Sequence, residues 1–270
     1  MSWGPSVQKL FHLPLLLLAL GALSTGSLEA KKKPPAQPPP PVLAVRINDL
    51  AKQLPGVLLE DAGPITGEIQ KLVVDHMTEW MANRTPTDVD VRRELENAFS
   101  LLHYPLSGDP AAFAFPWKGA LVIGAGYTLS WTNFNKQNVV AIFVNRGGTS
   151  RLAAVTNFVP YTDLHYEMLP AQGWDDLRFF IYGFRPGKSQ LRLTVILYAF
   201  DGQNLKSLWE RHDAFDGKME VQKDKVVVRY LREEEYIREV NERRKPPRHE
   251  AVYRITPKGL ELQDDHEIPF

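Results

Sequence analysis

The sequence predicts an α+β protein, with a helical segment at residues 43–110 followed by a mainly antiparallel β domain at residues 111–270. In the first segment, apolar residues recur at the spacing of one helix face. From Gly119 onward, β-branched and aromatic residues alternate with polar ones, which is the pattern of a half-buried strand. Turn sequences recur at intervals of about ten residues, as expected of a sandwich or barrel-like meander rather than of alternating βαβ units.

The clearest helical pattern runs from Ile65 to Met81, and a weaker one covers Leu43 to Leu54. A further helix is expected to start near Thr85 and Pro86, because threonine caps helix N-termini and proline suits the first helical position. The predicted apolar faces are Ile65, Ile69, Leu72, Val73, Met77 and Trp80 in one helix, and Val91, Leu95, Ala98, Phe99 and Leu102 in the next.

The predicted strands lie between glycine- and aspartate-containing turns such as Asp201-Gly202. A charged insertion at residues 232–249 interrupts them, with a short helix followed by a basic, proline-bounded loop. The strands are expected at residues 120–132, 138–145, 151–159, 177–184, 190–200, 205–211, 218–222, 225–231, 250–256 and 259–263.

Residues 1–30 have the order of regions found in a secretory signal peptide. Lys9 precedes an apolar run from Leu10 to Leu23, and small residues follow up to Ala30. We expect cleavage after Ala30, with a cut after Ser24 as the alternative. An uncleaved membrane anchor is the competing interpretation, but the apolar run is shorter than the roughly 20 residues that cross a bilayer. The sequence therefore predicts export, with no stable transmembrane span after cleavage.

A Lys/Pro-rich linker at residues 31–42 is expected to form an extended spacer before the folded part. The 270-residue chain has no cysteine, which excludes disulfides, thiolate nucleophiles, zinc–thiolate sites and iron–sulfur clusters. An exported chain without cysteine favours a bacterial envelope. We therefore predict a periplasmic or extracellular location.

The charge balance gives no sign of a nucleic-acid partner. Lysine and arginine number 32, aspartate and glutamate also number 32, and the formal net charge is zero. Proteins that bind nucleic acids use a basic excess to displace counterions from phosphates. We therefore expect no nucleic-acid partner.

Near-matches to catalytic and cofactor motifs lack essential parts. Gly183 and Gly187-Lys188-Ser189 have three residues between the glycines, whereas a phosphate-binding P-loop has four and continues as a helix. Adjacent carboxylates at Asp175 and Asp176 would point to opposite faces of a strand, so they are not expected to share a site. The run Asp264–Glu267 has metal-ligand chemistry, but its place near the C-terminus favours a solvated segment. No catalytic residue, metal or cofactor is predicted.

Two groups of residues are candidates for binding. Trp117 and Trp131 would suit a stacking platform for sugars or peptide side chains, although packing in the core is the alternative. The basic loop would suit an acidic protein face, a cell-wall polymer or anionic lipid; the alternative is a solvated turn whose charge is balanced by neighbouring glutamates. Its candidate residues are Arg243, Arg244, Lys245 and Arg248.

Together these features favour an exported, non-catalytic binding or assembly module of the bacterial cell envelope, with a protein or cell-wall glycan as partner. An open antiparallel sheet adds to this expectation, because its edges accept partner strands. Two alternatives stay open from sequence: a carboxylate-dependent hydrolase or carbohydrate-active protein, and a peripheral membrane-surface protein held by the basic loop.

Overall fold

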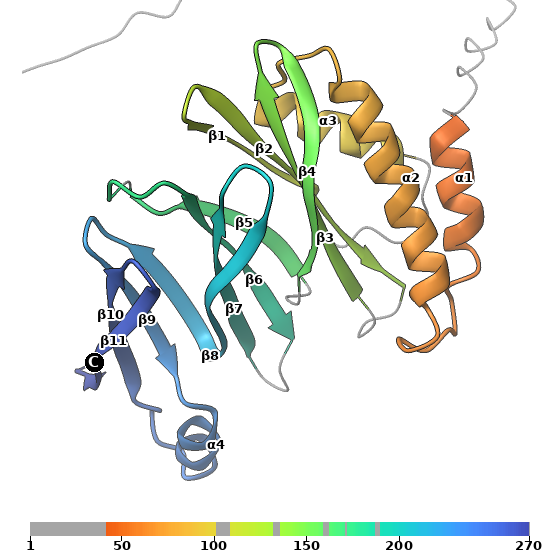
Figure 1. Cartoon of the computed structure of the whole chain (residues 1–270). Coiled ribbons are helices and arrows are strands. Elements are labelled where there is room, and N and C mark those ends of the chain that lie inside the picture. Colours follow the sequence, from red (N-terminus) through yellow and green to blue (C-terminus); the bar gives the residue numbers. More distant parts are fainter. Residues whose placement is uncertain are drawn as a thin grey trace, which may run out of the picture. The chain divides into compact units, whose positions relative to one another are not determined.

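The computed structural model describes residues 42–100, 109–131, 136–158, 162–170, 172–186 and 190–269. It confirms the α+β prediction: helices precede two antiparallel sheets (Figure 1). The proposed signal peptide and most of the linker lie outside the described residues. The helices are α1 (Val42–Ala51), α2 (Gly63–Met81), α3 (Asp88–Phe99) and α4 (Glu233–Asn241); the strands are β1 (Ala111–Trp117), β2 (Ala120–Ser130), β3 (Lys136–Arg146), β4 (Thr149–Phe158), β5 (Thr162–Met168), β6 (Leu177–Pro186), β7 (Leu191–Phe200), β8 (Leu205–Val221), β9 (Lys225–Leu231), β10 (Arg248–Thr256) and β11 (Gly259–Ile268).

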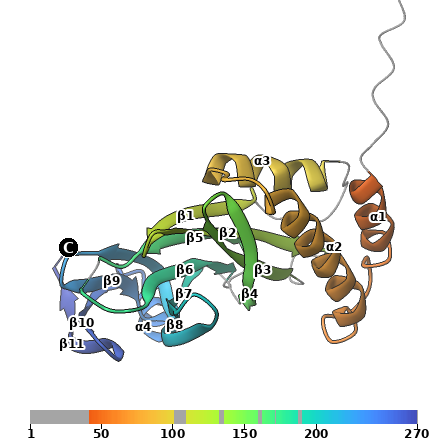
Figure 2. The same cartoon turned by 45° about the horizontal axis from the view of Figure 1, so that its top comes forward.

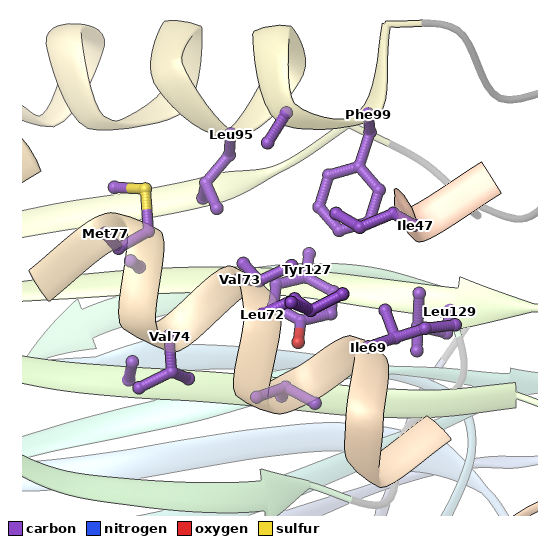
Figure 3. Packing of buried hydrophobic residues seen from close by; sticks show 14 of the residues in the cluster. Ile47, Ile69, Leu72, Val73, Val74, Met77, Leu95, Phe99, Tyr127 and Leu129 are labelled. Atoms are coloured by element: carbon purple, nitrogen blue, oxygen red, sulfur yellow. The ribbon is translucent and has the colours of Figure 1, made fainter. Parts of the chain in front are cut away.

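The helices α1 to α3 pack on one face of a sheet ordered β1-β2-β3-β4. Figure 3 shows how α2 and α3 turn their apolar faces toward Tyr127 and Leu129 of β2. The predicted faces of α2 and α3 supply this core, with Ile65 and Trp80 only partly buried and Leu102 outside the described residues. Burial of these apolar faces, at about 25 cal/mol per Å² of apolar surface, holds the helices to the sheet.

The start of α3 differs from the expectation at Thr85 and Pro86. Thr87 is the N-cap, and its side-chain oxygen accepts a hydrogen bond from the backbone N–H of Asp90 at 3.2 Å. The Asp90 carboxylate in turn accepts one from the backbone N–H of Thr87 at 3.0 Å. This reciprocal pair satisfies two otherwise unpaired donors of the first turn, so the helix begins at Asp88.

The other face of the first sheet packs on a second sheet, ordered β11-β10-β9-β8-β7-β6-β5. Even-numbered residues of β2 and β3, such as Val122 and Val140, meet Phe179 of β6 and Phe200 of β7 there. Gly124 and Gly126 face this interface, where an added Cβ would lie 2.1 Å from the Phe113 ring and 2.0 Å from the Tyr166 hydroxyl, respectively. Both glycines therefore serve close packing.

The second sheet curls around a third core, so it is barrel-like as well as part of a sandwich. Phe180, Val195 and Val228 lie in this core. The curl brings the start of β11 against β8, where the Cβ position of Gly259 is 2.8 Å from the Leu208 carbonyl oxygen. Arg178 of β6 reaches the β10–β11 turn, although three other strands separate β6 from β10 in the sheet order.

Three strand predictions need correction. Residues 205–211 and 218–222 belong to one long strand, β8. A bulge between Phe215 and Lys218 stands where a turn was expected, and it contains Asp216 at φ 45°. The strands β1 and β5 were not among the sequence expectations. The run Asp264–Glu267, expected to be a solvated terminal segment, continues β11, with its side chains largely exposed.

Within the charged insertion, Glu233–Asn241 form α4, and no residue of this helix is buried. The end of the predicted basic loop, Arg248 and His249, instead begins β10. Among the described residues, no helix combines the length and apolarity needed to cross a membrane.

Candidate functional site

A groove of about 610 Å³ runs between the edges of the two sheets. Pro110–Phe115 line one side and Asp163–Tyr166 line the other, with Asp88 and Arg92 of α3 and Asp109 beside them. Figure 2 shows β1, β5 and α3 next to one another. The two lining stretches lie about fifty residues apart in sequence, since antiparallel folding brings both sheet edges to the same side.

The lining of this groove includes consecutive residues of β1, which shows that it follows the backbone edge of the strand. Side chains on a strand alternate between faces. Ala112 and Ala114 pack toward the helices, whereas Phe113 and Phe115 pack toward the second sheet. Within the described residues, β1 pairs with β2 alone and β5 with β6 alone. Each strand therefore presents one edge whose backbone groups join no further described strand.

Tyr166 ties the two edges together. Its hydroxyl donates a hydrogen bond of 3.4 Å to the backbone oxygen of Ala111, and its ring meets that of Phe113 edge-on at 4.7 Å. Burial raises the pKa of Tyr166, so the hydroxyl stays protonated and able to donate. This contact fixes the spacing between β1 and β5.

The charged residues at the groove are mainly acidic. Asp88, Asp109 and Asp163 line it together with one arginine, Arg92. Lys136 is outside the lining but close enough to Asp163 for that carboxylate to raise the lysine pKa, although burial is the larger effect and lowers it. The side chains lining the groove therefore favour a cationic occupant over an anionic one.

The structure places the two candidate tryptophans at opposite ends of β2. Trp117 stands opposite Ala120 at the start of β2, half-buried against Phe200, with ring centroids 5.9 Å apart. Trp131 follows the end of β2, is 5% exposed, and donates its indole N–H to the Val57 carbonyl at 3.2 Å. A strand of 11 residues separates them by about 35 Å. They do not form a shared stacking platform.

Several residues of the candidate basic loop are held in ion pairs. Arg244 pairs with Glu239 at 2.6 Å and with Glu242, and Arg248 pairs with Asp216. Arg243 is exposed at φ 57°, and Lys245 lines a cavity beside Pro246. Much of the charge of this loop is balanced locally, as the solvated-turn alternative expects.

We expect the Glu239 carboxylate to titrate far below its ordinary range. Hydrogen bonds from Arg244 and then Arg238 lower its pKa from 4.5 to about 2. A lowered pKa in the folded state stabilises the fold above the unfolded value, and this contribution disappears as the pH falls from about 4.5 to about 2. Carbon-detected NMR titration should give a midpoint near 2, and the R244Q variant should raise it. An unchanged midpoint in R244Q would contradict the assigned pair.

The carboxylate candidates do not converge on a shared site. Asp175 is fully exposed and pairs with Lys118 at 3.1 Å, whereas Asp176 binds Arg178 at 2.8 Å. In the run Asp264–Glu267, Asp265 accepts a hydrogen bond from Tyr230 at 2.7 Å and His266 pairs with Asp264. No group of three or more metal-ligating side chains gathers among the residues that the structure describes.

The region that resembles a P-loop is followed by a strand. Gly183 lies within β6, and β7 begins at Leu191. Gly187, Lys188 and Ser189 lie outside the described residues.

Comparison with known proteins gives no assignment: no family model matches the chain, and no curated protein matches its sequence. The sequence did not predict the residues that line the groove as a site. The alanines of β1 carry no chemical signal, and the groove forms only when two distant edges meet.

Proposed function

We propose that the protein is an exported, non-catalytic binding module of the bacterial cell envelope that receives an extended, cationic segment of a partner protein. The single observation that carries this proposal is the groove between two strand edges, lined along six consecutive positions from Pro110 to Phe115. Export and envelope location rest on the leader-like residues 1–30 and on the lack of cysteine.

The strand β1 is the better template for an added strand. Its register with β2 is regular from Ala111 to Trp117, whereas β5 has an irregularity between Thr162 and His165. Ala111, Ala112 and Ala114 are small, so little side-chain bulk stands beside the edge. Six residues of a strand extend about 20 Å, which defines the length of segment that the groove would hold. Main-chain hydrogen bonds would supply affinity, as in other cases of strand addition.

The acidic side chains supply the preference for charge. Lysine or arginine in the partner would approach Asp88, Asp109 and Asp163, which line a partly enclosed groove where a neutral segment gains nothing from them. A cell-wall glycan is the other partner class expected from sequence. It would make no ladder with β1, so the experiment below distinguishes the two.

Selection of random short segments from a display library against the purified protein tests this proposal. We expect enrichment of extended sequences with lysine or arginine. The triple variant D88N/D109N/D163N should bind them about tenfold more weakly, since three solvent-accessible charge pairs at about 0.5 kcal/mol each sum to about 1.5 kcal/mol. Asparagine at position 163 tolerates the φ of 47° found there.

The matched control is D49N/D61N/E267Q, which removes three exposed acidic charges away from the groove. It should bind the selected segments as tightly as the unmodified protein. Equal weakening by both triple variants would show a general charge effect and contradict the groove. If no segment is enriched and the protein is retained on isolated cell wall, the partner is a glycan and the proposed protein segment is contradicted.

A further inference from the structure

A second cavity, of about 750 Å³, lies on the second sheet. Its lining comes from β6, β7, β8, β9, the first turn of α4 and β11. Four arginines and five carboxylates line it. The groove between β1 and β5 shares none of these residues.

Three of the four arginines have their charge satisfied by carboxylates. Arg192 donates to both oxygens of Glu233 at 2.5 Å. Arg211 pairs with Asp213 at 2.8 Å and also donates to the Tyr253 hydroxyl at 2.6 Å. Arg232 lies 3.5 Å from Glu235 and 3.6 Å from Asp265. These cations are therefore already engaged.

Arg185 is different. It is half-buried, its Nε is covered by protein, and this atom has no hydrogen-bond acceptor among the described residues. In the β6–β7 ladder it stands directly opposite Arg192. Like charges directly opposite one another destabilise a sheet, and Glu233 already gives both its oxygens to Arg192. Among the described residues, no carboxylate forms an ion pair with Arg185, although Glu234 also lines the cavity.

We propose that Arg185 binds an oxyanion, a carboxylate or phosphate group of a small ligand, inside this cavity. Because Nε is covered by protein, the two Nη groups supply the forked pair of donors that matches either group. A cavity of this volume is in the range of small-molecule sites. The ligand supplies the acceptor that no described residue gives to Arg185, while Arg192 stays paired with Glu233.

Titration of the full-length protein with inorganic phosphate and, separately, with succinate tests this assignment. Two-dimensional NMR of the arginine Nε–H resonances reports on Arg185 itself, with sodium chloride at matched ionic strength as the reference. We expect one oxyanion to shift the Arg185 resonance in a saturable way, and the identity of that probe distinguishes phosphate from carboxylate ligands. Absence of a saturable shift with both probes would overturn the proposal.

Variants connect the affinity to the arginine. R185Q should weaken binding of the active probe at least tenfold, and R185K should weaken it less, because lysine keeps the charge but loses the fork. R254Q is the matched control, since Arg254 is an exposed arginine on β10 paired with Glu261. Thermal unfolding establishes that each variant is folded. Affinity retained in a folded R185Q would overturn the assignment.

Discussion

Replacement of Gly124 with alanine should destabilise the protein by about 2 kcal/mol, within the range measured for overpacked cores. The added Cβ would lie 2.1 Å from Phe113, which stands directly opposite Gly124 in the β1–β2 ladder. The ring is 4% exposed and packs against Phe115 at 4.5 Å and Phe179 at 5.1 Å, so it has little room to move. Urea unfolding should show a lower midpoint at an unchanged slope.

The matched control is G67A, on the exposed face of α2, where no neighbouring atom lies within 4 Å of the Cβ position. Alanine there should stabilise the protein by about 0.5–1 kcal/mol, because it reduces the freedom of the unfolded chain. Replacing the Phe113 ring with the smaller leucine side chain, in F113L/G124A, should recover part of the lost stability. Equal stability of G124A and the unmodified protein would contradict the packing that positions β1.

Replacement of Arg178 with methionine should cost about 3 kcal/mol, as expected when one partner of a buried ion pair is removed. Arg178 is 6% exposed and donates to the carbonyls of Thr256 at 3.0 Å and Pro257 at 2.9 Å. It also pairs with Asp176 at 2.8 Å and lies 3.8 Å above the Trp174 ring. Methionine would leave these acceptors without their donor and open the curl between β6 and the β10–β11 turn.

R254M is the matched control, because it shows how much stability is lost when an exposed arginine is replaced by methionine. The Arg254 side chain is 61% exposed and pairs with Glu261, so its removal should change the free energy of unfolding by less than about 1 kcal/mol. Both unfolding midpoints can be measured by urea titration followed by tryptophan fluorescence. Equal midpoints for R178M and R254M would contradict the structural role of Arg178.

The helices and the central strands could be predicted because their burial is one-sided or complete. In α2, Ile69, Leu72, Val73 and Met77 all reach the core, so the sequence period of a helix is visible. In β3, residues from Asn138 to Asn145 are buried on both faces, which produces a β-branched, apolar run. Burial of this kind leaves a pattern in the residues themselves.

The strands β1 and β5 carry a weaker signal. Large apolar residues alternate in both, but few β-branched residues stand among them. Between Ala111 and Trp117, three alanines and Pro116 lower the β propensity, and proline is tolerated because the strand is at an edge. In β5, Asp163, His165 and Glu167 alternate with few β-branched residues. Edge strands need less apolar surface than central ones. The same property that made these strands difficult to predict exposes their backbone in the groove.

The site itself could not be predicted, because its parts are distant in sequence. The binding candidates were chosen for side-chain chemistry, and Trp131 proved to be a buried residue that anchors the Val57 carbonyl. The charge of Arg185 was not distinctive in a chain with 32 basic residues. It becomes distinctive only beside Arg192 and Glu233, whose pairing depends on strand register and on the position of α4.

Amide hydrogen exchange of β1, measured with and without a selected cationic segment, tests the central claim most directly. In an antiparallel ladder, N–H groups that face one neighbour alternate with those that face the other. Strand addition therefore predicts slower exchange at alternate residues of β1, with no change in β4 and β11, the edge strands at the opposite ends of the two sheets. Unchanged exchange throughout β1 in the presence of a bound segment would contradict the account.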